Sequence, residues 1–242
     1  MKVEKIEVDS AIFGRSALAL KDPLPGDDLG TIEAAYIREF QPVYVSCRLP
    51  LEDLAAIHQF ERHGFELVET QIRSSIRFSK TFDVTPYPYE YQRVTTREAL
   101  DAVLDIAART VVHDRFTIDA AVPRHVSGER YRRYVEKSFA ASDEAVWRLV
   151  DPRTGQTLNF RTHRVTGPGE VLLLLGGVHP DFKNVGLGAI GSYLCFNQMR
   201  AEGIKRAVTH ISAINYPVFN LEIGRLGFRV EATFAVLRKL YP

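Results

Sequence analysis

A glycine-rich loop between an apolar run and a helical pattern is the feature that most constrains the fold of this chain. The run V-L-L-L-L-G-G-V ends at Val178, and H-P-D-F-K-N-V-G-L-G-A-I-G, residues 179–191, follows directly. The near-continuous apolar run predicts a central strand, Glu170–Val178, that is buried on both faces. Glycines after such a strand let the chain turn tightly. The sequence therefore predicts a strand, a glycine loop and a helix in succession.

The loop invites three interpretations. Gly186, Gly188 and Gly191 match the G-x-G-x-x-G spacing of dinucleotide-binding folds. Such a site needs further strands and helices after the loop, and an acidic residue about twenty positions on. The chain ends too soon, and no Asp or Glu lies between Glu202 and Glu222. Two interpretations remain, an anion site at a helix N-terminus and a plain strand-to-helix turn.

The composition is that of a folded protein without a strong electrostatic footprint. The formal net charge is +1, from 31 Lys and Arg against 30 Asp and Glu, so nothing favours nucleic acid or an anionic membrane as a partner. No signal peptide or membrane-spanning run is expected. Cys47 and Cys195 are expected to be buried free thiols, which suits a cytoplasmic location. The sequence leaves open whether the chain is a monomer or a homodimer.

Two α/β halves are predicted, with the boundary in the irregular segment T-F-D-V-T-P-Y-P-Y-E-Y. Residues 1–85 are expected to form a small domain, and residues 86–242 a larger one. In the small domain a strand precedes a helix that ends at Gly64. The apolar stripe of that helix is expected to contain Leu51, Leu54, Ile57 and Phe60. In the larger domain helices are expected at 96–111, 129–139 and after the glycine loop, with a short one at 217–225, and strands at 144–150, 157–165, 170–178, 206–212 and 230–240.

One segment of each half echoes the other. F-E-R-H-G-F-E-L-V-E-T, residues 60–70, and I-G-R-L-G-F-R-V-E-A-T, residues 223–233, both have the pattern of a helix, a Gly-Phe stop and a strand. Two related halves would produce this repeat. Chance convergence on a common helix-to-strand turn would produce it as well.

The residues around the loop resemble the acetyl-CoA signature of the Gcn5-related N-acetyltransferase (GNAT) superfamily. In that signature a strand ending in Val-x-Pro precedes Arg/Gln-x-x-Gly-x-Gly/Ala. Val178, Pro180, Lys183, Gly186 and Gly188 match it, with lysine in place of Arg or Gln. The stretch N-Y-P-V-F-N-L-E-I-G-R-L-G-F, residues 215–228, resembles the family's second marker, an Asn followed by a short helix that ends in Leu-Gly-Phe.

This resemblance implies the GNAT fold, a mixed twisted sheet flanked by helices, with a smaller N-terminal half that resembles a partial GNAT unit. D-S-A-I-F-G near the start and the H-D-R-F-x-x-D loop also resemble the TDP-fucosamine acetyltransferase branch, which acetylates the 4-amino group of a nucleotide-linked 4,6-dideoxyhexose. It implies acetyl transfer from acetyl-CoA to a primary amine of a small molecule, with a nucleotide-activated amino sugar as the preferred acceptor. The alternatives are a peptide, antibiotic or polyamine acceptor, and a degenerate module that binds CoA without catalysis.

The resemblance also implies which residues contact acetyl-CoA. The strand backbone before the loop would bond the pantetheine, and the loop N–H groups from Asn184 to Ala189 would hold the pyrophosphate. The Val178 N–H would be the oxyanion donor. The implied cofactor-binding residues are Gly176, Gly177, Val178, Lys183, Asn184, Val185, Gly186, Leu187, Gly188, Ala189 and Asn215.

The proton-transfer groups stay open, because Glu222 stands where the family has a tyrosine. Tyr216, Glu222 and water are the candidate general acids. His210 is either a proton relay through water or a structural histidine.

The resemblance to the TDP-fucosamine acetyltransferase branch implies that the loop before the second helix covers the acceptor site. His113, Arg115 and Phe116 are the candidate substrate contacts there, and Arg115 either clamps a phosphate or forms an ordinary salt bridge. The seven histidines are scattered, so no metal site is expected.

Overall fold

The computed structural model describes residues 1–24, 26–110, 113–123 and 125–242. The N-terminal half begins with β1 (Lys2–Lys5), α1 (Glu7–Phe13), β2 (Ala17–Lys21) and α2 (Leu29–Phe40). It continues with β3 (Tyr44–Pro50), α3 (Leu54–Arg62) and β4 (Glu66–Arg77). Asp53 caps α3 by accepting a hydrogen bond from the Ala56 N–H at 3.0 Å. As predicted, Gly64 follows the helix in the left-handed conformation, with φ of +80°.

The C-terminal half has more elements. They are β5 (Glu90–Arg93), α4 (Arg97–Thr110), α5 (Arg115–Ile118), α6 (His125–Ala140), β6 (Glu144–Val150), β7 (Thr157–Gly167), β8 (Glu170–Val178), a 3-10 turn (Pro180–Phe182), α7 (Leu187–Ala201), β9 (Arg206–Ser212), α8 (Tyr216–Asn220), a π-helix (Leu221–Leu226) and β10 (Arg229–Leu240). Thr96 caps α4, because its hydroxyl accepts a hydrogen bond from the Ala99 N–H at 3.3 Å. The elements predicted from residue 42 onward are confirmed, with bounds that shift by a few residues, whereas β1, α1, β2, α2, β5 and α5 were not predicted.

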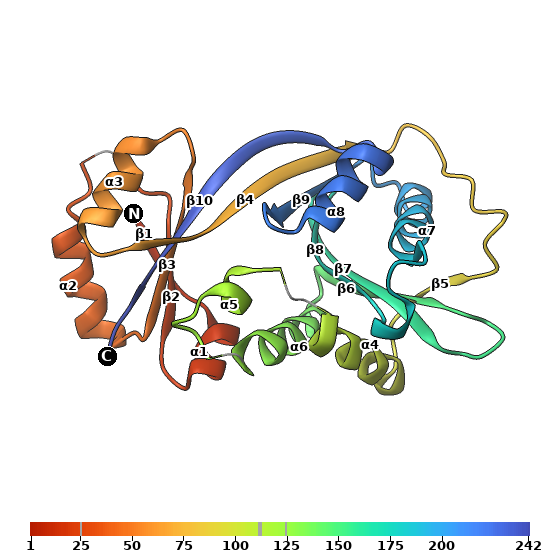
Figure 1. Ribbon diagram of the computed structural model, residues 1–242, viewed down its shortest axis with the longest axis horizontal. Helices are drawn as coiled ribbons and strands as arrows, with labels where there is room; N and C mark the ends of the chain where they lie inside the picture. The colour runs from red at the N-terminus through yellow and green to blue at the C-terminus, as the bar shows by residue number, and fades with distance from the viewer. Residues whose placement is uncertain (25, 111–112, 124) are drawn as a thin grey trace.

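All ten strands form one mixed sheet, in the order β1-β2-β3-β10-β4-β9-β8-β7-β6-β5. The pairs β2–β3 and β8–β9 are parallel, and the other neighbours are antiparallel. In Figure 1, the long strands β4 and β10 arch across the molecule, and α1, α5, α6 and α4 form a row beneath them. The predicted α/β fold class, a mixed sheet flanked by helices, is confirmed.

The two halves are related by an internal pseudo-twofold. The central strand order is β2-β3-β10-β4-β9-β8. Exchanging β2, β3 and β4 with β8, β9 and β10 gives the same order read from the opposite end. The β4–β10 register carries one bulge on each strand, at Val68 and at Glu231. These positions are equivalent when Gly64 is aligned with Gly227. The echo in the sequence therefore reflects two similar units that have exchanged their last strands.

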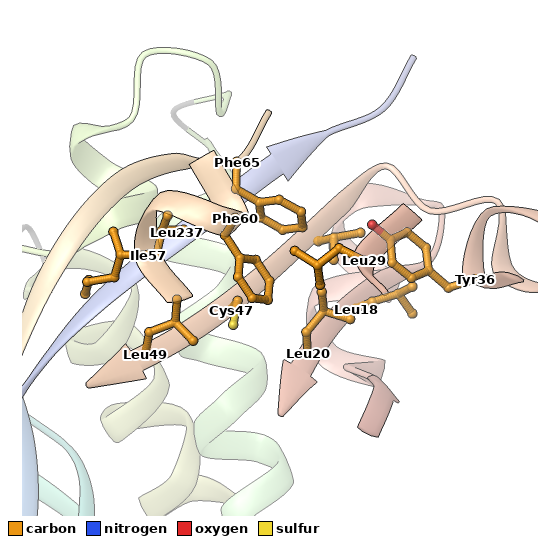
Figure 2. Close-up of a cluster of buried hydrophobic side chains, with 12 residues drawn as sticks. Leu18, Leu20, Leu29, Tyr36, Cys47, Leu49, Ile57, Phe60, Phe65 and Leu237 are labelled. Carbon is orange, nitrogen blue, oxygen red and sulfur yellow. The ribbon is translucent and has the colours of Figure 1, made fainter. Parts of the chain in front are cut away.

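This exchange joins the cores of the two halves. Figure 2 shows the N-terminal core, in which Ile57 and Phe60 of α3 pack with Cys47 and Leu49 of β3 and with Leu237 from the C-terminal strand. The boundary near residue 85 stays a prediction about chain organisation, and the sheet is continuous across it. Cys47 and Cys195 are buried and free, as expected. Among the described residues, no helix is long and apolar enough to cross a bilayer.

Two details of the predicted elements are wrong. Strand β8 is not buried on both faces, because only Val171 and Leu173 are buried and Leu174–Val178 are partly or fully accessible. The stripe predicted for α3 is also too long, since Leu51 precedes the helix and both it and Leu54 are exposed. The accessible part of β8 begins where its pairing with β9 ends at Leu173, and Leu51 and Leu54 lie before and at the first residue of α3.

Candidate functional site

Strands β8 and β9 separate in the middle of the sheet. Their parallel pairing runs from Glu170 opposite Arg206 to Leu173 opposite Thr209 and then stops. Beyond that point β8 continues along β7 to Val178, and β9 continues along β4 to Ser212. The end of β8 therefore has an unpaired edge that faces the gap between the strands.

The register of β8 shows which N–H groups face this gap. The His179 N–H donates to the Leu158 carbonyl at 2.8 Å, and Phe160 is opposite Gly177. In an antiparallel pair, hydrogen-bonded and non-bonded positions alternate. The N–H groups of Gly176 and Val178 therefore point away from β7 and towards the gap. A linear amide such as pantetheine finds donors there, and Val178 retains the donor predicted for an oxyanion.

The N-terminus of α7 offers a second row of free donors. Within the described residues, the N–H groups of residues 184–188 have no hydrogen-bond partner. The Ala189 N–H bonds to the Gly186 carbonyl at 3.0 Å and is not a free donor, so its predicted contact with the pyrophosphate stays a prediction. Asn184 and Gly186 have positive φ values of 66° and 86°, which turn the successive N–H groups of the loop outward. Lys183 is exposed beside them.

The equivalent helix of the other half is closed to anions. Helix α2 begins after Asp28, whose carboxylate accepts hydrogen bonds from the Gly30 and Thr31 N–H groups at 3.0 and 3.3 Å. Helix α7 begins after Gly186 and has no side-chain cap. The positive end of a helix dipole attracts an anion, and Asp28 already supplies one to α2. Of these two equivalent helices, α7 has the open N-terminus and α2 the closed one.

Two glycines near the cradle serve packing. A Cβ on Gly191 would lie 3.0 Å from the Asn159 side chain, so this glycine lets α7 approach β7. A Cβ on Gly177 would lie 2.5 Å from the Thr110 hydroxyl. The absence of a side chain at Gly177 therefore serves the approach of α4 to β8, in addition to the predicted exposure of the strand backbone.

Glu222 is buried in the π-helix beside the gap. Its side chain accepts a hydrogen bond from the Ser74 hydroxyl at 3.3 Å, and the residue is 4% exposed. Burial raises the pKa of Glu222 to about 7, against the opposing effect of Arg161 and the hydrogen bond from Ser74. Single-turn π segments are frequent at functional sites. The preceding Leu221 contacts the position where a Gly188 Cβ would stand, so this segment borders the start of α7.

The other predicted proton-transfer groups are less suited to that role. Tyr216 is 65% exposed and has no hydrogen bond from its hydroxyl among the described residues. Asn215 caps α8 by accepting from the Val218 N–H at 3.4 Å, and its predicted contact with the cofactor stays a prediction. Burial, with help from Arg48 and Arg73, lowers the pKa of His210 to about 4, so that histidine is neutral near pH 7.

Of the three predicted contacts in the acceptor loop, Phe116 is buried, Arg115 is mostly buried and His113 is exposed. Phe116 is 1% exposed and stacks on Tyr44, so it supports the site from within the core. Arg115 forms a salt bridge with Glu69 at 3.2 Å, which is the ordinary pairing that the sequence left open for it. His113 is exposed at the start of this loop. A cavity of about 250 Å³ lies next to α5, between Glu69, Ile118 and Ser212.

Several polar residues on the strands next to this cavity were missed by the sequence interpretation. Glu69 lines the cavity, and Arg48, Gln71 and Arg73 lie on the same two strands, β3 and β4, far along the chain from the glycine loop. An alternation of polar and apolar residues on these strands was the available signal, but the sequence could not show that β4 lies beside β9. Within the described ranges, no three metal-ligating side chains converge.

Comparison with solved structures agrees with this geometry. No protein-family model matches the sequence, and no curated protein resembles it by sequence. The fold is similar to a GCN5-related N-acetyltransferase from Sphaerobacter thermophilus, with 14% identity and a TM-score of 0.69 over 98% of this chain and 76% of that one. It is also similar to a tandem GNAT protein of the clavulanic acid biosynthesis pathway, with 14% identity and a TM-score of 0.62 over 93% and 76% of the two chains.

A third similar structure is a GCN5-related glucosamine N-acetyltransferase region of a fungal multi-domain β-N-acetylglucosaminidase. It has 13% identity and a TM-score of 0.64, and the match covers 93% of this chain and 30% of that one. The chain therefore has the GNAT fold.

Proposed function

We propose that this protein is an acetyl-CoA-dependent N-acetyltransferase that acts on a primary amine of a small molecule. The observation that carries the proposal is the combination of the unpaired β8 edge and the uncapped start of α7. The first offers the Gly176 and Val178 N–H groups, and the second offers five consecutive N–H groups beside Lys183. Donors in that order suit a linear amide followed by a pyrophosphate.

The proposed reaction requires the chain to orient two substrates and to manage charge. Acetyl-CoA supplies a thioester, and the neutral amine nitrogen bonds to its carbonyl carbon while the carbon–sulfur bond breaks. The Val178 N–H is aimed into the gap and would stabilise the oxyanion. The leaving sulfur takes a proton, and the nitrogen releases one to solvent.

Glu222 is the proposed source of the proton for the sulfur. A carboxyl group with a pKa of about 7 is half protonated near neutral pH, which suits a general acid. It occupies the position at which the resembling family has a tyrosine. Tyr216 has no comparable burial or support.

The preferred acceptor is a nucleotide-activated amino sugar. A solved neighbour named for glucosamine N-acetylation has the same fold, so this fold accommodates an amino-sugar acceptor. The acceptor would enter from the face of the sheet that carries the cavity at Glu69 and Ser212.

A product assay tests the proposal. The protein is incubated with acetyl-CoA and a panel containing a TDP-4-amino-4,6-dideoxyhexose, glucosamine, a peptide amine and spermidine, and both thiol release and acetylated product are measured. We expect the amino sugar to be acetylated fastest. Faster acetylation of the peptide or of spermidine would move the acceptor class, and binding of CoA without thiol release from any amine would identify a non-catalytic module.

A further inference from the structure

A patch of polar side chains covers the face of β3, β10, β4 and β9 that is opposite to α2 and α3. Directly opposed residues in neighbouring strands share a face. Cys47 and Leu49 face α2 and α3, so Arg48 between them faces the other way. Three rows of opposed residues cross this face: Arg48, Val236 and Glu69; Phe234, Gln71 and Ser212; and Arg73 with His210. We call these eight residues the acceptor face.

Arg48 has no carboxylate partner among the described residues. The nearest carboxylate in its own row is Glu69, which already accepts hydrogen bonds from Gln71 at 2.8 Å and from Arg115 at 3.2 Å. Arg73 is also paired, at 3.3 Å from Glu231. The Arg48 guanidinium instead lies over the Phe234 ring, 5.1 Å from its centre.

The surroundings of Arg48 are electropositive. Partial burial and the charges of Arg115 and Arg73 lower the pKa of Arg48. His210, whose ring centre is 6.0 Å from that of Phe234, is neutral near pH 7 and adds no charge to this face. Exposure of Arg48 leaves its guanidinium accessible. An accessible cation that no carboxylate neutralises, set beside two other arginines, favours an anion from solution.

We propose that Arg48 binds a negatively charged group of the acceptor, at some distance from the amine that is acetylated. The proposal rests on the proposed function, because it places the amine at the gap between β8 and β9. Phe234 lies on β10, and β9 is two strands away across β4. Two strand spacings are about 10 Å. Because the gap lies beyond β9, the acceptor must carry its phosphate or carboxylate at least that far from its amine.

This spacing selects among anionic amines. An α-amino acid holds its amine and carboxylate on one carbon, so it cannot reach both places. A diphosphate linked through the ring of an amino sugar is long enough, and so is a carboxylate at the far end of an extended amine. The geometry therefore specifies a long anionic acceptor. Whether its negative charge comes from a phosphate or from a carboxylate is decided by the choice of substrates in the test.

The test compares Arg48→Gln with Arg62→Gln in the full chain. Arg62 is an exposed arginine at the end of α3, on the opposite side of the sheet, and forms no ion pair among the described residues. Both variants lose one positive charge. KM and kcat are measured for a TDP-4-amino-4,6-dideoxyhexose, for the same sugar without the nucleotide, for 6-aminohexanoate and its amide, and for alanine.

We expect Arg48→Gln to raise KM for the long anionic acceptor about tenfold or more, as for loss of a hydrogen bond to a charged group. KM for acetyl-CoA, and KM for the free sugar and the amide, should stay unchanged, and Arg62→Gln should resemble the wild type. A preference for 6-aminohexanoate over the nucleotide sugar would assign the anion as a carboxylate. An equal effect of Arg48→Gln on charged and neutral acceptors, the lack of any effect, or efficient use of alanine would overturn the proposal.

Binding of thymidine diphosphate, measured by titration calorimetry without acetyl-CoA, separates this proposal from the proposed function. Binding that Arg48→Gln weakens and Arg62→Gln does not would support the anion site even if no amine were acetylated. Failure of acetyl-CoA to bind would overturn the proposed function and leave this result standing. If neither thymidine diphosphate nor 6-aminohexanoate bound to the wild type, the assignment of Arg48 would be wrong.

Discussion

Glu222 is a carboxyl group in a place that disfavours its charge, and this has a cost in stability. Its folded pKa of about 7 lies above the ordinary value of 4.5. The folded protein therefore binds this proton more tightly than the unfolded chain does. The contribution of the protonated Glu222 carboxyl group to the free energy of unfolding is fully present below about pH 4.5. It is lost as pH rises through about 7.

Glu222→Gln should therefore stabilise the protein at pH 8 by up to about 3 kcal/mol, and by much less at pH 5. Urea denaturation of both proteins at the two pH values measures the difference. Glu39→Gln is the control, because Glu39 is exposed on α2 and forms no hydrogen bond among the described residues. A gain in stability that is equal at both pH values would contradict the buried, raised pKa of Glu222.

The same substitution should lower kcat if Glu222 protonates the leaving sulfur. General acids contribute about 100-fold or more, so we expect a loss of that order near pH 7 with KM for acetyl-CoA little changed. The wild-type kcat should also fall as pH rises above about 7, because Glu222 then loses its proton. If kcat of Glu222→Gln fell above about pH 7 in the same way as that of the wild type, another group or water would supply the proton.

At this scale the sequence predicted the position of Glu222 but not its environment. The motif from Asn215 to Phe228 identified the residue that replaces the family tyrosine. Its burial depends on Ser74, which lies on a strand of the other half, and no local pattern encodes that contact. Arg48 was missed for the same reason, since an arginine within an apolar strand has no motif of its own.

Among the elements, helices α2 and α7 hold equivalent places and differ in their caps. Asp28 closes α2, whereas Gly186 leaves α7 open. Replacing Gly186 by aspartate would give α7 the negative charge that α2 already has. Asparagine has nearly the same shape and tolerates a positive φ equally well, so it separates charge from strain.

Gly186→Asp should weaken binding of CoA about 100-fold, and Gly186→Asn should weaken it by much less, because only aspartate repels a pyrophosphate. Titration calorimetry with CoA at low and physiological salt measures both. If the two variants bound CoA equally, the start of α7 would not be the pyrophosphate site.

The order of strand, loop and helix around Gly186 was predictable because it is local. The closed state of α2 was not inferred, although D-D-L-G contains its capping residue.

The whole molecule is held together by the exchange of β4 and β10. Leu237 of β10 is fully buried in the N-terminal core, although it lies near the end of the chain. Leu237→Ala should destabilise the protein by about 2–5 kcal/mol. Val230→Ala, at a position that is 48% exposed on the same strand, should cost far less.

The single tryptophan distinguishes cooperative from independent unfolding. Trp147 lies on β6, in the C-terminal half. Because β10 pairs with β3 and β4, we expect Leu237→Ala to shift the fluorescence transition of Trp147 as far as the circular dichroism transition. A fluorescence transition that stayed in place would show that the halves unfold separately.

No sequence pattern predicted this coupling of the halves. Strands β4 and β10 are about 160 positions apart, and their pairing is a tertiary contact.

The central claim is that one of the two related halves, and not both, binds acetyl-CoA. Titration calorimetry of the wild-type protein with acetyl-CoA tests it most directly, because the open start of α7 and the closed start of α2 fix the stoichiometry. We expect saturable binding of one molecule per chain, and we expect Gly186→Asp to abolish it. Binding of two molecules per chain, or no binding at millimolar acetyl-CoA, would contradict it.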